Sequence, residues 1–218
     1  MKTKVYVSSI IAVLMLPIFS SAQDNSAVDV RKFEAAAEFT TITFEPGNTK
    51  VGLGGRFTYN FNKYFALEAA GYMFQGCDFC GRQSGTTSEG FFGVKIGKRF
   101  QHWGIFGKAR PGLISASKGR FDFATTGTPI AVTGSQFFFV QKRETSFATD
   151  VGAVLEFYPT KRVITRLDFG VPIIHYSRHT TTTPVFDPVT GTYRLGTAII
   201  PADTQGSLQV MASVGFRF

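Results

Sequence analysis

Hydrophobic and polar residues alternate with a period of two along most of the chain, and helical periodicity is absent. In the segment 32–44, Phe33 and Phe39 fall on one face while Glu34 and Glu38 fall on the other. Such alternation predicts β-strands with one apolar and one polar face. Segments of this kind are predicted at 32–44, 51–61, 64–74, 90–100, 103–115, 145–158, 162–174 and 207–218. Pro111 is unusual inside a paired strand and is expected to mark a bulge.

The links between these strands alternate in length. Tight turns are predicted at 62–63, 101–102 and 159–161, and longer links at 45–50, 75–89, 116–144 and 175–206. Short turns at one rim and long loops at the other are typical of bacterial outer-membrane barrels, whereas a soluble β-sandwich predicts no such alternation. The sequence therefore predicts an all-β fold, an eight-stranded antiparallel up-and-down transmembrane β-barrel. Residues 186–193, in the last link, predict an extra hairpin outside the membrane.

The alternation alone leaves open which face points inward, because a soluble lipocalin-like barrel would enclose its apolar face. The polar face carries nearly balanced charges, as a narrow lumen requires, since an unpaired buried charge is costly. Aromatic residues gather at the short-turn rim, where a membrane-interface girdle belongs: Tyr59, Phe61, Tyr64, Phe65, Phe100, Trp103, Phe157 and Tyr158. We therefore expect a closed lumen with an ion-pair network of Glu34, Glu38, Arg56, Glu68, Lys95, Arg99, Lys108, Arg110, Asp150, Glu156, Arg166, Asp168 and Arg217.

The first 22 residues form a different kind of segment. Lys2 and Lys4 precede an apolar run at 10–19, and Ser20, Ser21 and Ala22 provide a small-residue cleavage site. This pattern predicts a secretory signal peptide at 1–22, because the apolar run is shorter than the roughly 20 residues of a spanning helix. We expect a short periplasmic segment at 23–31 and an outer-membrane barrel with four extracellular loops at 32–218.

Composition narrows the remaining classes. The 218 residues are 44% hydrophobic and 15% aromatic, so an exported chain without a spanning helix is either a soluble secreted protein or a transmembrane barrel. Cys77 and Cys80 are expected to form a loop disulfide in an oxidising compartment. A CxxC redox motif would need a βαβ pattern that is absent, and two cysteines are too few for structural zinc. No metal, cofactor or nucleic-acid partner is expected.

Several motifs resemble the OmpA-like eight-stranded outer-membrane barrel family. They are the terminal Val214-Gly215-Phe216-Arg217-Phe218, the glycine-rich 52–61 running into 64–72 with Glu68, and 93–97 followed by Lys108-Ala109-Arg110. The resemblance spans residues 32–218. It implies that Phe216 and Phe218 act as an assembly signal for the barrel-assembly machinery. Larger members add a peptidoglycan-binding domain after the barrel, and that activity is not expected here.

Two further features bear on function. His175-Tyr176-Ser177 resembles the His-x-Ser element of outer-membrane lipid A deacylases, but no glutamate follows Glu156 to orient the histidine, and the asparagine expected after the serine is Arg178. Basic residues in the long links could contact lipopolysaccharide phosphates or be plain solvated surface: Lys118, Arg120, Lys142, Arg143, Arg178 and Arg194. We expect a monomeric, non-enzymatic outer-membrane barrel, surrounded by lipid and lipopolysaccharide, with a structural or surface-interaction role. The alternatives are a deacylase-like enzyme and a soluble periplasmic ligand-binding barrel.

Overall fold

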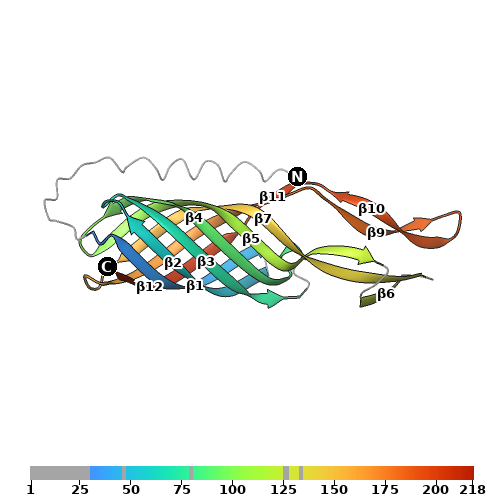
Figure 1. Ribbon diagram of the computed structural model, residues 1–218, viewed down its shortest axis with the longest axis horizontal. Helices are drawn as coiled ribbons and strands as arrows, with labels where there is room; N and C mark the ends of the chain where they lie inside the picture. Colours follow the sequence, from blue (N-terminus) through green and yellow to red (C-terminus); the bar gives the residue numbers. More distant parts are fainter. Residues whose placement is uncertain (1–29, 46–47, 79–80, 125–127, 133–134) are drawn as a thin grey trace.

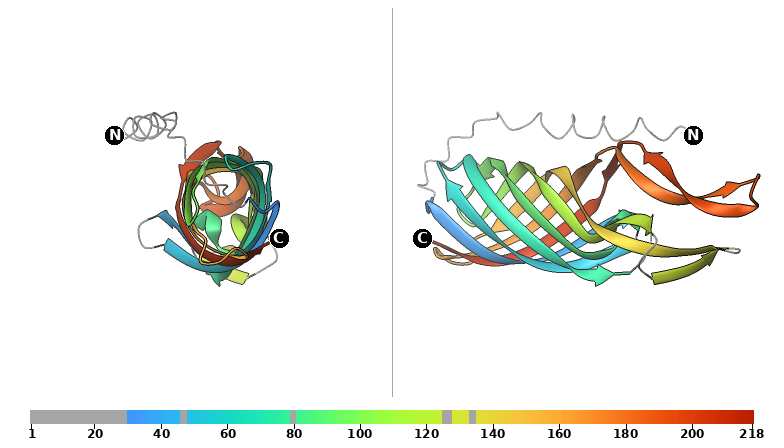
Figure 2. Two further views of the ribbon diagram at one scale, coloured as in Figure 1. Left: turned by 90° about the vertical axis from the view of Figure 1, so that its left-hand side faces the viewer. Right: turned by 45° about the vertical axis from the view of Figure 1, so that its right-hand side comes forward.

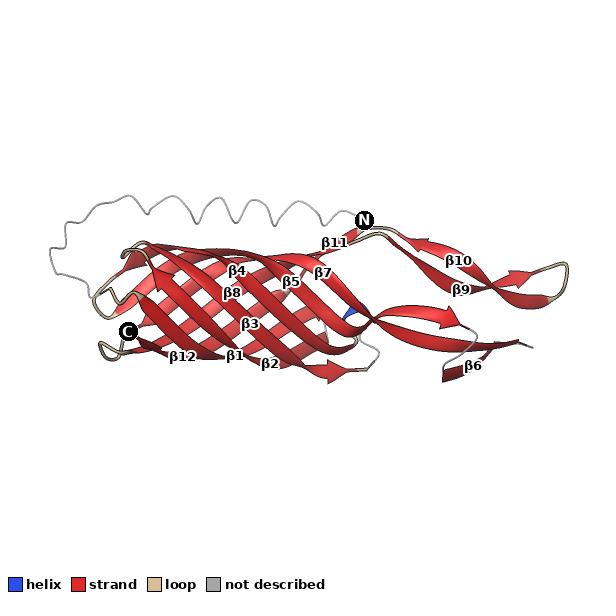
Figure 3. Ribbon diagram, in the orientation of Figure 1, coloured by secondary structure: helices blue, strands red, loops and turns tan. Residues whose placement is uncertain are grey.

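Eight antiparallel strands close into a barrel in the computed structural model (Figures 1 and 3). Residues 30–218 are described, apart from 46–47, 79–80, 125–127 and 133–134. The barrel strands are β1 (Phe33–Glu45), β2 (Asn48–Asn60), β3 (Phe65–Cys77), β4 (Gly85–Arg99), β5 (Trp103–Ala124), β7 (Ser135–Phe157), β8 (Val163–Tyr176) and β12 (Leu208–Arg217). The predicted fold class is therefore confirmed. The predicted signal peptide at 1–22 lies outside the described residues, as does most of the segment predicted at 23–31.

The barrel closes where the last strand meets the first. β12 pairs with β1 in an unbroken antiparallel register, with Ala37 opposite Val214. At the short-turn rim, Phe33 and Phe218 exchange two backbone hydrogen bonds of 2.9 Å, and their rings stack with centroids 5.9 Å apart. Closure leaves the barrel itself with no open strand edge.

Side chains along each barrel strand alternate between the outer wall and the interior. The outer wall is apolar, with Leu53 69% exposed, Phe92 58% exposed and Phe216 65% exposed. The residues that alternate with these outward side chains along each strand point into the barrel and are buried. Figure 2 shows the barrel end-on. This is the inverse of a soluble globular protein, in which water-facing residues are polar.

Two strand pairs continue beyond the barrel at the long-link end. β5 and β7 extend through much of the link predicted at 116–144, and β6 (Thr128–Val132) adds a third strand to this arm. β9 (His179–Asp187) and β10 (Thr192–Ile200) form a separate hairpin, as predicted around residues 186–193. The short β11 (Asp203–Gly206) returns the chain alongside β8. Among the described residues, no helix is long and apolar enough to cross a membrane.

The prediction of a β-bulge at Pro111 is wrong. Pro111 lies opposite Thr149 of β7 in regular register. On the other side, the β4–β5 pairing stops after Phe91–Gly112 and resumes at Val94–Ala109 without a shift. Proline has no backbone N–H, so it interrupts the ladder with β4 and leaves the register intact.

The closing contact at the rim predicts that Phe218→Asp weakens the barrel. The change removes a stacked ring and puts a charge at the membrane interface, so we expect the free energy of unfolding to fall by about 1–2 kcal/mol. Urea titration of the refolded protein and the amount of folded protein in the outer membrane measure the effect. Val189→Asp is the control, because Val189 is 91% exposed in the β9–β10 turn. Equal behaviour of the two variants would contradict a role for Phe218.

Candidate functional site

The candidate site is the interior of the barrel, which is lined by charged side chains. Every residue that the sequence predicts for the lumen network is inside the barrel and at most 4% exposed. They come from all eight barrel strands, because the inward residues of each strand share one parity. The acidic residues of this network are Glu34, Glu38, Glu68, Asp150, Glu156 and Asp168, and the basic ones are Arg56, Lys95, Arg99, Lys108, Arg110, Arg166 and Arg217.

Glu68 of β3 is the centre of this network. Its carboxylate forms a short ion pair with Arg166, and it lies 3.5 Å from Arg56, 3.5 Å from Lys95 and 3.6 Å from Arg110. These cations project from β2, β4, β5 and β8. A single carboxylate therefore joins strands on opposite sides of the barrel.

A second group of ion pairs lies nearer the short-turn rim. Arg99 bridges two carboxylates, at 3.1 Å from Glu34 and 3.3 Å from Glu156. Tyr158 donates a 2.7 Å hydrogen bond to Glu156 and accepts one of 2.8 Å from Arg99. The sequence predicts Tyr158 for the aromatic girdle, and this is wrong: its ring is buried inside, only 6% exposed. Phenol groups that reach a charged lumen satisfy their hydroxyl there.

The third group lies on β5, β7 and β8. Asp150 accepts hydrogen bonds of 3.0 and 2.5 Å from Arg110, and Lys108 lies 2.9 Å from the same carboxylate. Asp168 accepts hydrogen bonds of 2.7 and 2.8 Å from Arg166. Paired, hydrogen-bonded geometry of this kind is what allows charges to remain ionised in a low-dielectric interior.

Several polar residues of the lumen are absent from the network that the sequence predicts. Tyr72 donates a 2.5 Å hydrogen bond to Glu38, and Asn60 donates one of 2.9 Å to Glu34. Glu89 accepts a 3.0 Å hydrogen bond from Gln209. Extending the inward parity of each strand finds Tyr72 and Asn60. Glu89 was missed because strand four was predicted to start at residue 90, whereas β4 starts at Gly85.

Towards the long-link end, the lumen changes from charged to apolar. The buried side chains there include Ile42, Phe74, Ile114, Ile174 and Met211, each at most 2% exposed. A charged tier and an apolar tier thus share the same interior. The alternation of charges along the strands did not predict the apolar tier.

A short turn closes the apolar end of the lumen. The 3-10 turn η1 (Gly81–Gln83) brings Gln83 inside, where its amide bonds the hydroxyl of Tyr176. Lys50 donates to the carbonyl of Gln83, to the carbonyl of Gly85 at 2.8 Å and to the hydroxyl of Thr87 at 2.8 Å. The buried ammonium therefore fastens this turn to the barrel wall.

The three histidines lie outside the lumen network. His175 is exposed on the outer wall, and its Nδ1 lies 3.2 Å from the hydroxyl of Thr204. His179 Nδ1 lies 3.3 Å from the carbonyl of Ser177, and His102 is exposed in a short turn. No carboxylate orients these rings, and no group of three or more His, Cys, Asp or Glu could hold a metal ion in the described part of the chain. The disulfide of Cys77 with Cys80 stays a prediction, because Cys80 lies outside the described residues.

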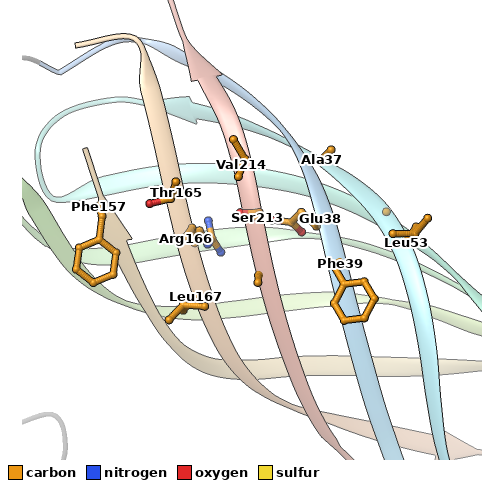
Figure 4. A pocket seen from close by; sticks show the side chains of 12 residues that line it. Ala37, Glu38, Phe39, Leu53, Phe157, Thr165, Arg166, Leu167, Ser213 and Val214 are labelled. Atoms are coloured by element: carbon orange, nitrogen blue, oxygen red, sulfur yellow. The ribbon is translucent and has the colours of Figure 1, made fainter. Parts of the chain in front are cut away.

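A groove of about 710 Å³ crosses the outer wall over β1, β2, β7, β8 and β12. Figure 4 shows Phe39, Leu53 and Leu167 beside it, and all three are exposed. Glu38 and Arg166 also line the groove, but their side chains are buried in the lumen ion pairs. The groove is therefore an apolar surface suited to lipid chains, without a free charged group among its lining residues.

Three of the six basic residues of the long links form ion pairs with nearby acids. Lys118 lies 2.8 Å from Asp78. Lys142 lies 2.9 Å and Arg120 3.8 Å from Asp122. Burial alone would raise the pKa of Asp122, but hydrogen bonds from Lys142 and Thr181 and the charge of Arg120 hold it below its ordinary value. Arg143, Arg178 and Arg194 are exposed.

The position of Glu68 predicts a large effect for Glu68→Gln. Without this carboxylate, the guanidinium of Arg166 and its neighbours would remain buried with too little negative charge, at a cost of about 3–5 kcal/mol in urea unfolding. Glu89→Gln is the matched control. Among the described residues Glu89 forms no ion pair, so its loss of charge should cost less than about 1 kcal/mol. Equal costs would contradict the network.

Comparisons with known proteins fit this architecture. No protein-family model and no curated protein matches the sequence. Among solved structures, the outer membrane protein OprG of Pseudomonas aeruginosa is 9% identical, with a TM-score of 0.53, covering 88% of this chain and 98% of OprG. Neisserial surface protein A is 13% identical (TM-score 0.47; 85% and 96% covered), and Ail of Yersinia pestis is 11% identical (0.46; 85% and 96%). The chain therefore has the fold of an eight-stranded outer-membrane barrel.

Proposed function

We propose that this protein is an integral outer-membrane barrel with a closed lumen. It acts as a scaffold for two arms on the cell surface, namely the β5–β7–β6 extension and the β9–β10 hairpin. One observation carries the proposal: buried charged residues from all eight barrel strands line the interior while the outer wall is apolar. Lipid solvates the apolar wall, and the closed backbone ladder leaves no strand edge exposed to lipid. The role of such a molecule is structural or surface-interactive.

The distribution of side chains weighs against a soluble periplasmic binding barrel. A ligand-binding barrel encloses an apolar cavity and presents charges to water. Here Leu53, Met73 and Phe216 are each at least 65% exposed on the outer wall, whereas Glu34 and Lys95 are fully buried. In water, such a wall would promote aggregation.

Two partner assignments and the oligomeric state belong to the same proposal. Outer-leaflet lipopolysaccharide would meet the exposed Arg143, Arg178 and Arg194, because guanidinium groups bind phosphates in bidentate fashion. The barrel-assembly machinery would recognise the last strand through Phe216 and Phe218. We propose a monomer within its own membrane, since the barrel closes without a second chain.

Membrane fractionation with gel migration tests the proposal. Because a folded transmembrane barrel resists unfolding by detergent without heat, we expect the protein in the outer-membrane fraction, with a mobility shift on boiling. Recovery in the soluble periplasmic fraction would contradict it. A periplasmic soluble protein followed in the same fractions is the control.

The filled lumen leads to a second prediction, which concerns ion conductance. Buried ion pairs and the apolar tier occupy the interior of an eight-stranded barrel, which is only wide enough for side chains. In planar bilayers the protein should therefore show at most small and rare conductances. A large, steady, ohmic current would overturn the sealed scaffold. A sixteen-stranded porin measured in the same bilayers provides the positive control.

A further inference from the structure

The strand β10 presents an open edge outside the barrel. Among the described strands it pairs with β9 alone, in a two-stranded sheet separate from the barrel sheet. The outer edge of β9 is partly covered, because the hydroxyl of Thr182 accepts a 3.1 Å hydrogen bond from the backbone N–H of Phe123 and donates one to the carbonyl of Phe123. An open edge displays backbone N–H and C=O groups that can pair with another chain.

β10 has few of the features that usually protect such an edge. Its nine residues contain neither proline nor lysine, Arg194 is their only charged residue, and they include Leu195, Ile199 and Ile200. The outer edge of β6 is shorter, with five residues, and carries Pro129. A two-stranded hairpin is only marginally stable in water, and a third strand stabilises it. β10 is therefore the edge at which a further strand would have the greatest effect.

The hairpin also exposes apolar side chains away from the outer wall. Phe186 and Ile199 are 51% and 57% exposed, and both lie on the face that carries Tyr193. The rings of Phe186 and Tyr193 are 5.3 Å apart, so this face carries an aromatic pair near the hairpin turn. Exposed apolar side chains gathered outside a membrane mark contact surfaces.

We propose that β10 pairs antiparallel with β10 of a second copy of this chain, so that the two hairpins join in one sheet. The inference rests on the proposed function, because the hairpin must lie on the cell surface. If all nine residues overlap symmetrically, Gly196 lies opposite itself. Arg194 then lies opposite Ala198, and Tyr193 lies opposite Ile199. The register avoids like charges and makes an aromatic–β-branched pair twice, both of which favour strand pairing.

The direction of the hairpin decides where the two barrels would lie. Antiparallel pairing of identical strands requires a two-fold axis perpendicular to the strands. Figure 1 shows the β9–β10 hairpin running outward from the barrel along its long axis. The two barrels would therefore lie at opposite ends of the joined sheet, in two facing membranes. Copies in one membrane point the same way, so they cannot pair in this manner and each remains a monomer there.

Vesicle clustering tests this contact. The full-length protein is reconstituted into phosphatidylcholine vesicles, and flotation and boiling-dependent gel migration verify insertion and folding separately. Light scattering then follows clustering of loaded vesicles, alone and mixed with protein-free vesicles. The proposal predicts clustering that requires protein in both membranes.

Charge substitutions at positions 194 and 198 test the proposed β10–β10 register. Ala198→Arg puts an arginine opposite Arg194 of the other copy at two symmetric places, and we expect clustering to fall about two- to thirtyfold. The double variant Arg194→Glu/Ala198→Arg places opposite charges there and should restore clustering. Positions 194 and 198 are about 13 Å apart along one strand, so the restored attraction can form only between copies.

The outcomes separate the inference from the proposed function. Folded, membrane-inserted wild type that does not cluster overturns the inference and leaves the barrel proposal intact. Clustering with protein-free vesicles points to lipid binding and also overturns it, as does a double variant as weak as Ala198→Arg. Failure of the protein to float with vesicles would overturn the proposed function itself.

Discussion

Charge burial inside a narrow, closed barrel is the constraint on which the rest of this structure depends. Eight strands leave an interior only wide enough for side chains, so each inward charge must find a partner among the other inward side chains. Glu68 meets cations from β2, β4, β5 and β8. The ion pairs therefore act across the barrel, whereas backbone hydrogen bonds join only neighbouring strands. They couple the register of strands that never touch.

The same constraint accounts for the two tiers of the lumen. Near the short-turn rim, carboxylates and cations neutralise one another, with Asn60, Tyr72 and Tyr158 filling the remaining hydrogen-bonding positions. Further along, Ile42, Phe74 and their neighbours exclude water by packing. The turn η1 then covers the apolar end. The β5–β7–β6 extension and the β9–β10 hairpin extend beyond the filled barrel at its long-link end.

The periodicity of two was sufficient to predict the eight strands and the parity of the lumen residues. Inward and outward side chains alternate without exception along a regular strand, so Glu34 and Glu38 had to share a face. Strand ends were less predictable. β5 and β7 continue past the barrel because they pair with each other there, and local sequence does not reveal that pairing. The late start assigned to strand four removed Glu89 from the predicted lumen.

The sequence by itself determined the strand number, the two faces and the balance of charge, because these follow from local alternation and composition. Only the tertiary structure decided which carboxylate meets which cation, since Glu68 and Arg166 are far apart in sequence and are joined by barrel closure and register. It also decided that Tyr158 faces the lumen and that Pro111 leaves the register unshifted. These outcomes depend on the stagger between strands, which is a property of the closed sheet and of no single segment.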